Sequence, residues 1–563
     1  MTRHRDLLNA SSVLSLGLGR RPASSSSMCL LAIAAAFAGA CSASSGTGGT
    51  GGTTGTGGTS SGGTTGTGGT TTGTGGSGTG GTKTGTGGTT TGTGGSGTGG
   101  SGTGGTGTGG SGTGGSATGG HGGGGGSSVA GSSGTGGSGA GTGGGPAGGG
   151  SSGNASVYNP NFVEFYGSDC TTATPQDVSI SGQLPNLFTK LDGTTMAKRS
   201  DWRCRRAEMK AVIEKYVFGA KPGAPDMVTG SVSTTAITVH AVLGTKSIDF
   251  TVPISIPSGA KMPAPIIIGL GGSSLDASIV SGAGVATGTY DHQGMMSESS
   301  RTGLFTNLYG TSTGVSSQIG WAWGFSRIID VLISEKAAGR NNIIDPTAVG
   351  VTGCSRDGKG AFTVGAFDER IALGIPQESG TAGVSAYRIV NTAPVGPNGN
   401  PAQSLSNAVS TAVGWFGPTF ESTYINKVDT IPGDTHSLAA MHAPRGLLVL
   451  DNSRIGELCA TCQHAATAAA QVMYQALGIG ANVGYNGGNP TDPQNHCQFY
   501  PTTQGPPLMR AIAGHLTKTA APDGRMEPQP AGTADLTKWV PWSSTAPTLT
   551  NDVSWSSPPL TSH

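Results

Sequence analysis

The segment 351–361 combines a serine with the surroundings that could make it a nucleophile. It reads Val-Thr-Gly-Cys-Ser-Arg-Asp-Gly-Lys-Gly-Ala, so a β-branched run ends at Ser355 and small residues follow that can open a helix. A serine on a strained turn between a strand and a helix exposes its hydroxyl, as in a nucleophile elbow. The usual pattern is Gly-x-Ser-x-Gly, and here the second glycine comes one residue late, at Gly358. Ser355 is therefore the candidate nucleophile.

A nucleophilic hydroxyl needs a base that accepts its proton. Where the nucleophile sits on such a turn, the base comes last in the chain order Ser, acid, His. His496 lies in a Pro- and Asn-rich loop after the last predicted strand, and it is the candidate base. We expect His240 and His464 to be structural. His436 and His442 flank a loop before a strand and are not excluded as the base.

Two carboxylates compete for the role of orienting that base. Glu378 follows the strand after the nucleophile, within Pro-Gln-Glu-Ser-Gly at 376–380. Asp451 ends a later strand, at a usual place for the acid in folds of this kind. The sequence leaves the choice between Glu378 and Asp451 open.

Two basic residues follow the candidate nucleophile. Arg356 adjoins Ser355, so its guanidinium and its backbone N–H can point at the oxyanion that forms when a carbonyl is attacked. A fixed donor there lowers the barrier by on the order of 3 kcal/mol. Lys359 comes four residues after Ser355, on the same face of a helix one turn along. We expect Lys359 to donate to hydroxyl groups of a bound substrate.

The elements that must position these residues alternate between strand and helix patterns. Period-2 alternation predicts antiparallel strands, and short apolar runs are typical of buried parallel strands. The predicted strands are 236–240, 248–252, 265–270, 349–351, 371–375 and 446–450, and the predicted helices are 323–338, 361–369, 465–477 and 508–516. Strands separated by helices predict an α/β fold with a mostly parallel central sheet and helices on both faces. After Thr517 the chain is Pro-rich and irregular, and we expect Trp539 and Trp542 to pin this tail to the domain.

The first 154 residues have a different composition. Residues 1–41 combine arginines, an apolar run and small residues ending at Cys41, which predicts a signal peptide. The ending resembles a bacterial lipobox, so Cys41 is a candidate lipidation site on a surface lipoprotein, and ordinary secretion is the alternative. Residues 42–154 are almost entirely Gly, Thr and Ser, which predicts a disordered spacer. Residues 155–563 are predicted to form the catalytic domain, with the irregular Pro-rich tail at its end.

Charge and cysteines limit the partners and the compartment. The net charge is +1 and only 11% of residues are charged, with no basic stripe, so a nucleic-acid partner is not expected. A protein of the cell envelope favours disulfides. A bridge between Cys354 and Cys497 would tie the turn of Ser355 to the loop of His496.

Three motifs occur together in order. They are Gly-Cys-Ser-Arg-x-Gly-Lys-Gly-Ala at 353–361, Pro-Gln-Glu-Ser-Gly at 376–380 and Asn-His-Cys-Gln-Phe at 495–499. They resemble the glucuronoyl esterases of carbohydrate esterase family 15, over a stretch from about Cys170 to Leu516. The resemblance implies an α/β-hydrolase three-layer sandwich that cleaves the ester between 4-O-methyl-glucuronic acid on xylan and lignin alcohols.

The resemblance also assigns roles by position. It implies Ser355 as nucleophile, His496 as base, Glu378 as acid, Arg356 as an aid to the oxyanion and Lys359 as a sugar ligand. Gln403 matches a glutamine that contacts substrate, in a stretch that aligns poorly. The implied disulfides are Cys170–Cys204 and Cys354–Cys497; Ala386 replaces one half of a third bridge of fungal members, and Cys459 and Cys462 form a C-x-x-C that can close on itself.

One departure bears on specificity. The family loop after the strand 446–450 usually carries a tryptophan that packs on the sugar, and here 451–458 contains none. We therefore keep a broader carboxylesterase as the alternative function, and a wall-binding module without catalysis as a remoter one. The expected partner is a glucuronoxylan or lignin-carbohydrate ester, with no cofactor and no metal. The protein is expected to be a monomer that meets a membrane only through a lipid anchor.

Overall fold

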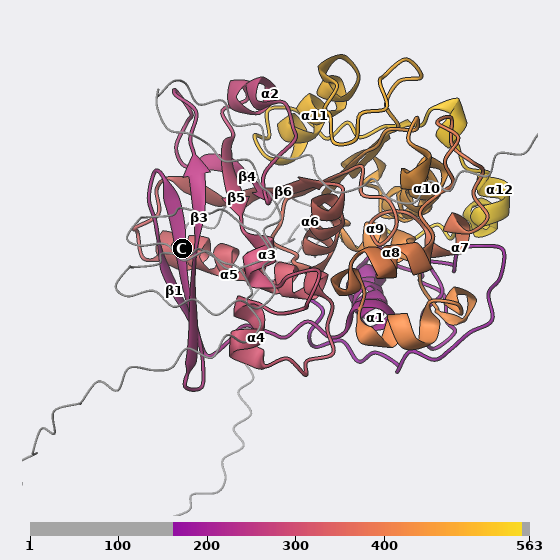
Figure 1. Cartoon of the computed structure of the whole chain (residues 1–563), viewed down its shortest axis with the longest axis horizontal. Helices are drawn as coiled ribbons and strands as arrows, with labels where there is room; N and C mark the ends of the chain where they lie inside the picture. The colour runs from indigo at the N-terminus through magenta and orange to yellow at the C-terminus, as the bar shows by residue number, and fades with distance from the viewer. Residues whose placement is uncertain (1–161, 554–563) are drawn as a thin grey trace, which may run out of the picture. The chain divides into compact units, whose positions relative to one another are not determined.

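The computed structural model of the protein describes residues 162–553, whose strands form one ten-stranded sheet (Figure 1). The strand order is β1-β2-β3-β5-β4-β6-β7-β8-β9-β10. Pairs from β1 to β5 along this order are antiparallel, and every later pair is parallel. The strands are β1 (Met227–Val232), β2 (Ala236–Leu243), β3 (Lys246–Ser255), β4 (Ala264–Leu270), β5 (Ala286–Tyr290), β6 (Ile344–Cys354), β7 (Leu373–Gln377), β8 (Gly446–Leu450), β9 (Val483–Asn486) and β10 (Met526–Glu527).

Twelve α-helices lie within the described residues. They are α1 (Trp202–Ile213), α2 (Ala277–Gly282), α3 (His292–Met295), α4 (Leu304–Tyr309), α5 (Ser317–Ala337), α6 (Arg356–Phe367), α7 (Tyr387–Val390), α8 (Leu405–Thr411), α9 (Thr435–Met441), α10 (Ala460–Ala476), α11 (Pro501–His515) and α12 (Leu536–Trp539). None of the helices within 162–553 is long and apolar enough to span a bilayer.

Two apolar cores, one on each face of the sheet, hold these layers together. Successive strand residues point to opposite faces, and on β4 the side chains of Ile266 and Ile268 join the larger core while Ile267 joins the smaller. The larger core includes residues of α1, α5, α6, α9 and α10, and the smaller includes residues of α2 and α11 (Figure 1). The predicted α/β fold with helices on both faces of a mostly parallel sheet is thereby confirmed.

Helix boundaries differ from those predicted, for local reasons. α5 begins at Ser317 rather than 323, because the Ser316 side chain accepts a hydrogen bond from the backbone N–H of Ile319 and caps the first turn. α6 begins directly after Ser355, and α10 begins at Ala460, so His464 lies inside that helix rather than at its start. α11 begins at Pro501 and runs through Pro506 and Pro507, which predict a break; here packing of Leu508 and Ile512 on the sheet outweighs local propensity.

The C-terminal tail is attached as expected. Trp539 and Trp542 are both buried. The indole Nε1 of Trp542 donates to the carbonyl of Leu184 at 2.8 Å, and the N–H of Leu184 donates to the carbonyl of Trp539 at 2.8 Å. The predicted signal peptide 1–41, with Cys41, and the predicted spacer 42–154 lie outside the described residues.

Candidate active site

Three parallel strands deliver the candidate residues to one edge of the sheet. Cys354 at the end of β6 pairs with Gln377 at the end of β7, and Gln377 pairs with Leu450 at the end of β8. The residues that follow these strand ends are Ser355, Glu378 and Asp451. Because the strands are parallel and in register, all three come to the same carboxyl edge, where ligands bind in sheets of this kind.

Ser355 occupies the strained turn that its sequence predicts. Its φ of 60° and ψ of −122° lie in a region that side chains rarely adopt, and α6 starts at the next residue. Gly358 explains why the second glycine comes late: a Cβ there would lie 2.5 Å from the carbonyl oxygen of Gln377. The helix meets β7 at Gly358, so glycine is needed at that position rather than one residue earlier.

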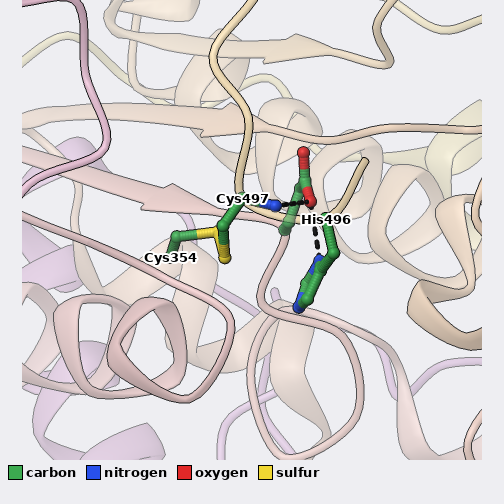
Figure 2. A group of neighbouring side chains, drawn as sticks. Cys354, His496 and Cys497 are labelled. Carbon is green, nitrogen blue, oxygen red and sulfur yellow. Dashed lines mark hydrogen bonds and ion pairs between the residues drawn. A yellow bond between two sulfur atoms is a disulfide. The ribbon is translucent and has the colours of Figure 1, made fainter. Parts of the chain in front are cut away.

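His496 and Glu378 are joined by a short hydrogen bond. The Nδ1 of His496 lies 2.7 Å from Oε2 of Glu378, and the backbone N–H of Cys497 donates to the same oxygen at 2.7 Å (Figure 2). The Glu378 side chain is fully buried, whereas that of His496 is 42% exposed. A proton on Nδ1 leaves Nε2 unprotonated, which is the tautomer that a general base requires.

A disulfide connects the two halves of this arrangement. Cys354 and Cys497 are bridged with a Cα–Cα distance of 5.6 Å (Figure 2). Each cysteine is the chain neighbour of a candidate catalytic residue, Ser355 or His496. The bond therefore limits how far the base can move from the nucleophile.

Four side chains around this disulfide lie close enough together to raise the question of a metal site. Cys354, Glu378, His496 and Cys497 each offer an atom within 4.8 Å of the others. Metal binding by cysteine requires the thiolate, and both sulfurs here are consumed in the disulfide. The donor set does not fit a metal ion, and its contacts serve to orient the imidazole.

Asp451 lies beside this group but makes different bonds. Its Oδ2 accepts a hydrogen bond from the Tyr485 hydroxyl at 2.9 Å, and its Oδ1 accepts one from the N–H of Asn452 at 2.8 Å. Burial, together with the charge of Glu378, raises the pKa of Asp451 to about 7, against the lowering effect of the hydrogen bonds from Tyr485 and Asn452. Of the two acids left open by the sequence, Glu378 is the one bonded to His496.

The two basic residues differ in exposure. The Arg356 side chain is 54% exposed and forms an ion pair with Glu298. Lys359 is buried: its Nζ donates to the carbonyl of Ser379 at 2.6 Å and lies 4.4 Å from the ring centroid of Trp415. Burial lowers the pKa of Lys359 to about 7, opposed by the charge of Glu298. The Lys359 ammonium, which we expected to donate to substrate hydroxyls, thus already donates to a backbone carbonyl of the protein.

Gln403 lies next to the loop that follows Glu378. Its carbonyl accepts a hydrogen bond from Oγ1 of Thr381 at 2.6 Å, and its side-chain Nε2 donates to Oδ1 of Asn407 at 3.0 Å. The residue is half-buried and lies two residues before α8. The structure therefore places its backbone, rather than its amide, against the acid loop.

The two histidines that the sequence left open, His436 and His442, are buried structural residues. His436 and His442 are fully buried; burial lowers the pKa of His436 to about 4 and holds the pKa of His442 well below its ordinary value. Their Nε2 atoms contact the carbonyl oxygens of Pro185 and Phe362, respectively. Both are held as neutral structural residues.

Two further disulfides occur in the described residues. Cys170–Cys204 joins the N-terminal segment to α1, and Cys459–Cys462 closes the C-x-x-C on itself. The backbone N–H of Ala386 donates to the carbonyl of Cys462 at 3.4 Å. Ala386, which replaces one half of the third bridge of fungal members, therefore lies beside the Cys459–Cys462 disulfide.

Sequence reasoning missed two residues of the site, Glu298 and Trp415. Glu298 is 7% exposed and contacts both Arg356 and the indole of Trp415. Neither residue belongs to one of the three motifs. The pair Gly414-Trp415, an aromatic residue beside a glycine, is the one sequence signal that could have indicated Trp415.

Comparisons with known proteins identify the family of the chain. A family model described as "Glucuronyl esterase, fungi" matches residues 238–478. The 4-O-methyl-glucuronoyl methylesterase of Neurospora crassa is 35% identical, over 67% of this chain and 93% of the relative. The chain belongs to the glucuronoyl esterase family.

Solved structures of glucuronoyl esterases share the fold. That from Sporotrichum thermophile is 35% identical with a TM-score of 0.61, and it covers 68% of this chain and 100% of its own. A serine-to-alanine mutant of that enzyme, in complex with methyl 4-O-methyl-beta-D-glucopyranuronate, is 34% identical with the same TM-score and the same coverage. The α/β-hydrolase fold predicted from the three motifs is thus the fold of this family.

Proposed function

We propose that this chain is a carboxylic-ester hydrolase that cleaves esters of glucuronic acid. Its substrate would be the ester between 4-O-methyl-glucuronic acid on xylan and a lignin alcohol, and its catalytic residues Ser355, His496 and Glu378. The observation that carries the proposal is the bond between His496 Nδ1 and Glu378 Oε2, 2.7 Å long, in a loop tied by a disulfide to the residue before Ser355. The names of the relatives and the glucuronate ester bound by one of them support the substrate class.

The mechanism follows from this arrangement. Ser355 Oγ attacks the ester carbonyl while Nε2 of His496 takes its proton, and Glu378 stabilises the imidazolium. The oxyanion accepts hydrogen bonds from the backbone N–H and the guanidinium of Arg356. Collapse breaks the bond to the alcohol, which leaves with the proton from His496. Water activated by the same imidazole then hydrolyses the acyl-enzyme, releasing glucuronate and restoring the Ser355 hydroxyl.

Hydrolysis of benzyl glucuronate by the purified domain tests this proposal. Release of benzyl alcohol is followed by chromatography, for the native chain and for Ser355→Ala. We expect turnover by the native chain and none above background for the variant, with unchanged circular dichroism. A native chain that binds glucuronoxylan and hydrolyses no ester would overturn the proposal and favour a binding module.

A broader carboxylesterase is the second candidate, because the loop 451–458 contains no tryptophan to pack on a sugar. Rates on benzyl glucuronate and on simple acetyl esters separate the two. A kcat/KM for the glucuronate at least about tenfold above that for the acetyl ester supports uronate selectivity. Equal values support the broader enzyme.

The location is proposed to be extracellular. Disulfides persist in oxidising compartments, and three of them, including the bridge beside Ser355, lie in the described residues. Cleavage of a signal peptide before Cys41, lipidation of that residue and a spacer over 42–154 would tether a monomeric domain of 155–563 to the surface of a bacterium. Mass spectrometry of the mature N-terminus separates a lipid-anchored protein from a freely secreted one.

A further inference from the structure

Glu298 lies in the loop between α3 and α4, outside the three motifs, and it contacts the residue next to the candidate nucleophile. Its Oε1 forms an ion pair with Nη1 of Arg356, and its Oε2 accepts a hydrogen bond from Nε1 of Trp415 at 2.7 Å. Glu298 is 7% exposed, whereas more than half of the Arg356 side chain is exposed. A buried carboxylate therefore pairs with a half-exposed guanidinium on the residue next to Ser355.

The backbone of Glu298 is itself fixed. Its N–H donates to Oε1 of Gln293 at 3.0 Å, and its carbonyl accepts from the N–H of Gly414 at 2.6 Å. A Cβ at Gly414 would lie 2.6 Å from that carbonyl oxygen, so the two loops approach as closely as only glycine allows. The carboxylate is thus held in place before any substrate arrives.

A second branch of contacts runs from Glu298 to Lys359. The indole that donates to Glu298 carries the Lys359 ammonium 4.4 Å from its ring centroid. A cation over an indole face is attracted by the ring, and the same ammonium donates to the carbonyl of Ser379, the residue after Glu378. Glu298 therefore supports both cations that flank Ser355, one directly and one through Trp415.

We propose that Glu298 is a positioning residue of the reaction: it holds the Arg356 guanidinium at the oxyanion and holds Trp415 against Lys359. The inference rests on the proposed function, which gives Arg356 its role at the oxyanion. It adds a residue outside the triad and its neighbouring motifs on which the transition state depends.

Glutamine is the informative replacement for Glu298. A carboxylate accepts from both N–H donors, whereas an amide accepts with one atom and turns N–H groups toward the other donor. Loss of one oxyanion donor lowers kcat by about 10²–10³, and a misaligned donor should cost less. We expect Glu298→Gln to lower kcat on benzyl glucuronate by roughly 10- to 100-fold with little change in KM.

A double-mutant cycle separates positioning from a general structural role. If Glu298 acts through Arg356, Glu298→Gln should cost much less in an Arg356→Ala background, so the two losses should not add. Additive losses would overturn the proposal. Glu298→Asp, which keeps the charge but is shorter, should fall between glutamine and the native residue and provides a second test if the glutamine variant folds poorly.

Glu421→Gln is the matched control. Glu421 pairs with Arg301, and the same guanidinium donates to the carbonyl of Phe416, so this pair also joins the loop of Glu298 to the loop of Trp415. Within the described residues, Glu421 forms no hydrogen bond or ion pair with Arg356 or Lys359. We expect its kcat to stay within about twofold of the native value. An equal fall in both glutamine variants would mean that loop anchoring alone matters and would contradict the proposal.

A readout independent of the natural substrate completes the design. A fluorophosphonate probe phosphonylates an activated serine, and an oxyanion also develops in that reaction. We expect Glu298→Gln to slow labelling of Ser355 by a factor similar to its fall in kcat. Normal labelling of the native chain without cleavage of benzyl glucuronate would sink only the substrate assignment, whereas labelling of Glu298→Gln at the native rate would sink the role of Glu298.

Discussion

The two ends of the parallel strands differ in how their buried polar groups are paired. At the amino end, Arg370 donates to Asp368 and Asp330, and Glu164 pairs with Lys221. All of these charges have partners of opposite sign, which compensates for much of the cost of removing them from water. This end ties the start of the described chain to α5 and to the entry of β7.

At the carboxyl end, strain and incomplete hydrogen bonding accumulate instead. Ser355, Glu378 and Cys497 have positive φ angles of 60°, 45° and 64°, each costing about 1–3 kcal/mol. Within the described part of the chain, Oε1 of Glu378 and Nε2 of Gln377 are buried without a hydrogen-bond partner. One end of the sheet stabilises the fold and the other holds reactive groups in unfavourable positions, so activity and stability should respond to different substitutions.

The largest effect should come from the acid at the carboxyl end. Glu378→Gln removes the charge that orients and stabilises His496, and we expect kcat to fall by about 10³–10⁴. Asp451→Asn should lower kcat less than tenfold, because the hydrogen bonds of Asp451 go to Tyr485 and Asn452. Steady-state rates on benzyl glucuronate measure both. A larger loss for Asp451→Asn would reassign the acid.

The two long-range disulfides test the same contrast. Their loops span 143 and 34 residues, so chain entropy predicts that removing Cys354–Cys497 or Cys170–Cys204 costs about 5 and about 4 kcal/mol of unfolding free energy. Only the first should also lower kcat, because it fixes the loop of His496. Urea unfolding and kinetics of the two double alanine variants give the comparison. Equal kcat losses would show that the ends are not independent.

Substitution of the buried arginine should affect stability alone. Arg370→Met leaves the buried Asp368 without its ion-pair partner, which typically costs about 3–5 kcal/mol, whereas Asp330 keeps its ion pair with Arg327. We expect a lower urea midpoint and an unchanged kcat/KM at 25 °C. A fall in kcat/KM in the fully folded variant would contradict the separation of roles.

The pH dependence of stability should reveal Asp451. Its folded pKa of about 7 lies above the ordinary value of about 4. Between these pH values Asp451 keeps its proton in the folded protein but has lost it in the unfolded chain. The contribution of Asp451 to the unfolding free energy is therefore complete below about pH 4 and is lost as the pH rises through about 7. Native unfolding free energy should therefore fall relative to Asp451→Asn by on the order of 3 kcal/mol across that window. Urea unfolding of both proteins at pH 4.5, 6 and 8 measures the difference, and parallel curves would be inconsistent with a raised pKa.

The smallest effect should be a gain. Ser355→Gly relieves a backbone conformation that glycine adopts without strain, so we expect the variant to be inactive and more stable by about 1 kcal/mol. Ser355→Ala, with a Cβ in the same strained position, is the control and should show no such gain. Equal melting temperatures for the two variants would mean that the turn stores little strain.

Much of the fold was predictable because its central strands are short apolar runs. The strand at Gly446–Leu450 matches its prediction to the residue, and β4 differs by one residue. The motif residues were predictable for a related reason: Asp451 directly follows such a run, and Ser355 and Glu378 come within four residues of one, so a strand pattern in the sequence also locates them at the edge of the sheet.

Elements without that pattern were missed. Helix α1 contains Arg205 and Arg206, which suggest a solvent-exposed segment, yet both are buried, because Glu208 and the carbonyl of Met441 accept their hydrogen bonds. Strand β5, Ala-Thr-Gly-Thr-Tyr, has no apolar run. Glu298 was equally hidden, since only tertiary folding brings its loop to Arg356.

The path by which the chain enters the catalytic body has a practical consequence. The N–H of Glu369 donates to the carbonyl of Glu164 just beyond the last turn of α6, whereas Ser355 immediately precedes the first turn. Twelve helical residues span about 18 Å. A support attached just before residue 162 would therefore hold the domain at the end remote from the nucleophile, and immobilisation there should leave Ser355 accessible to polymeric substrate.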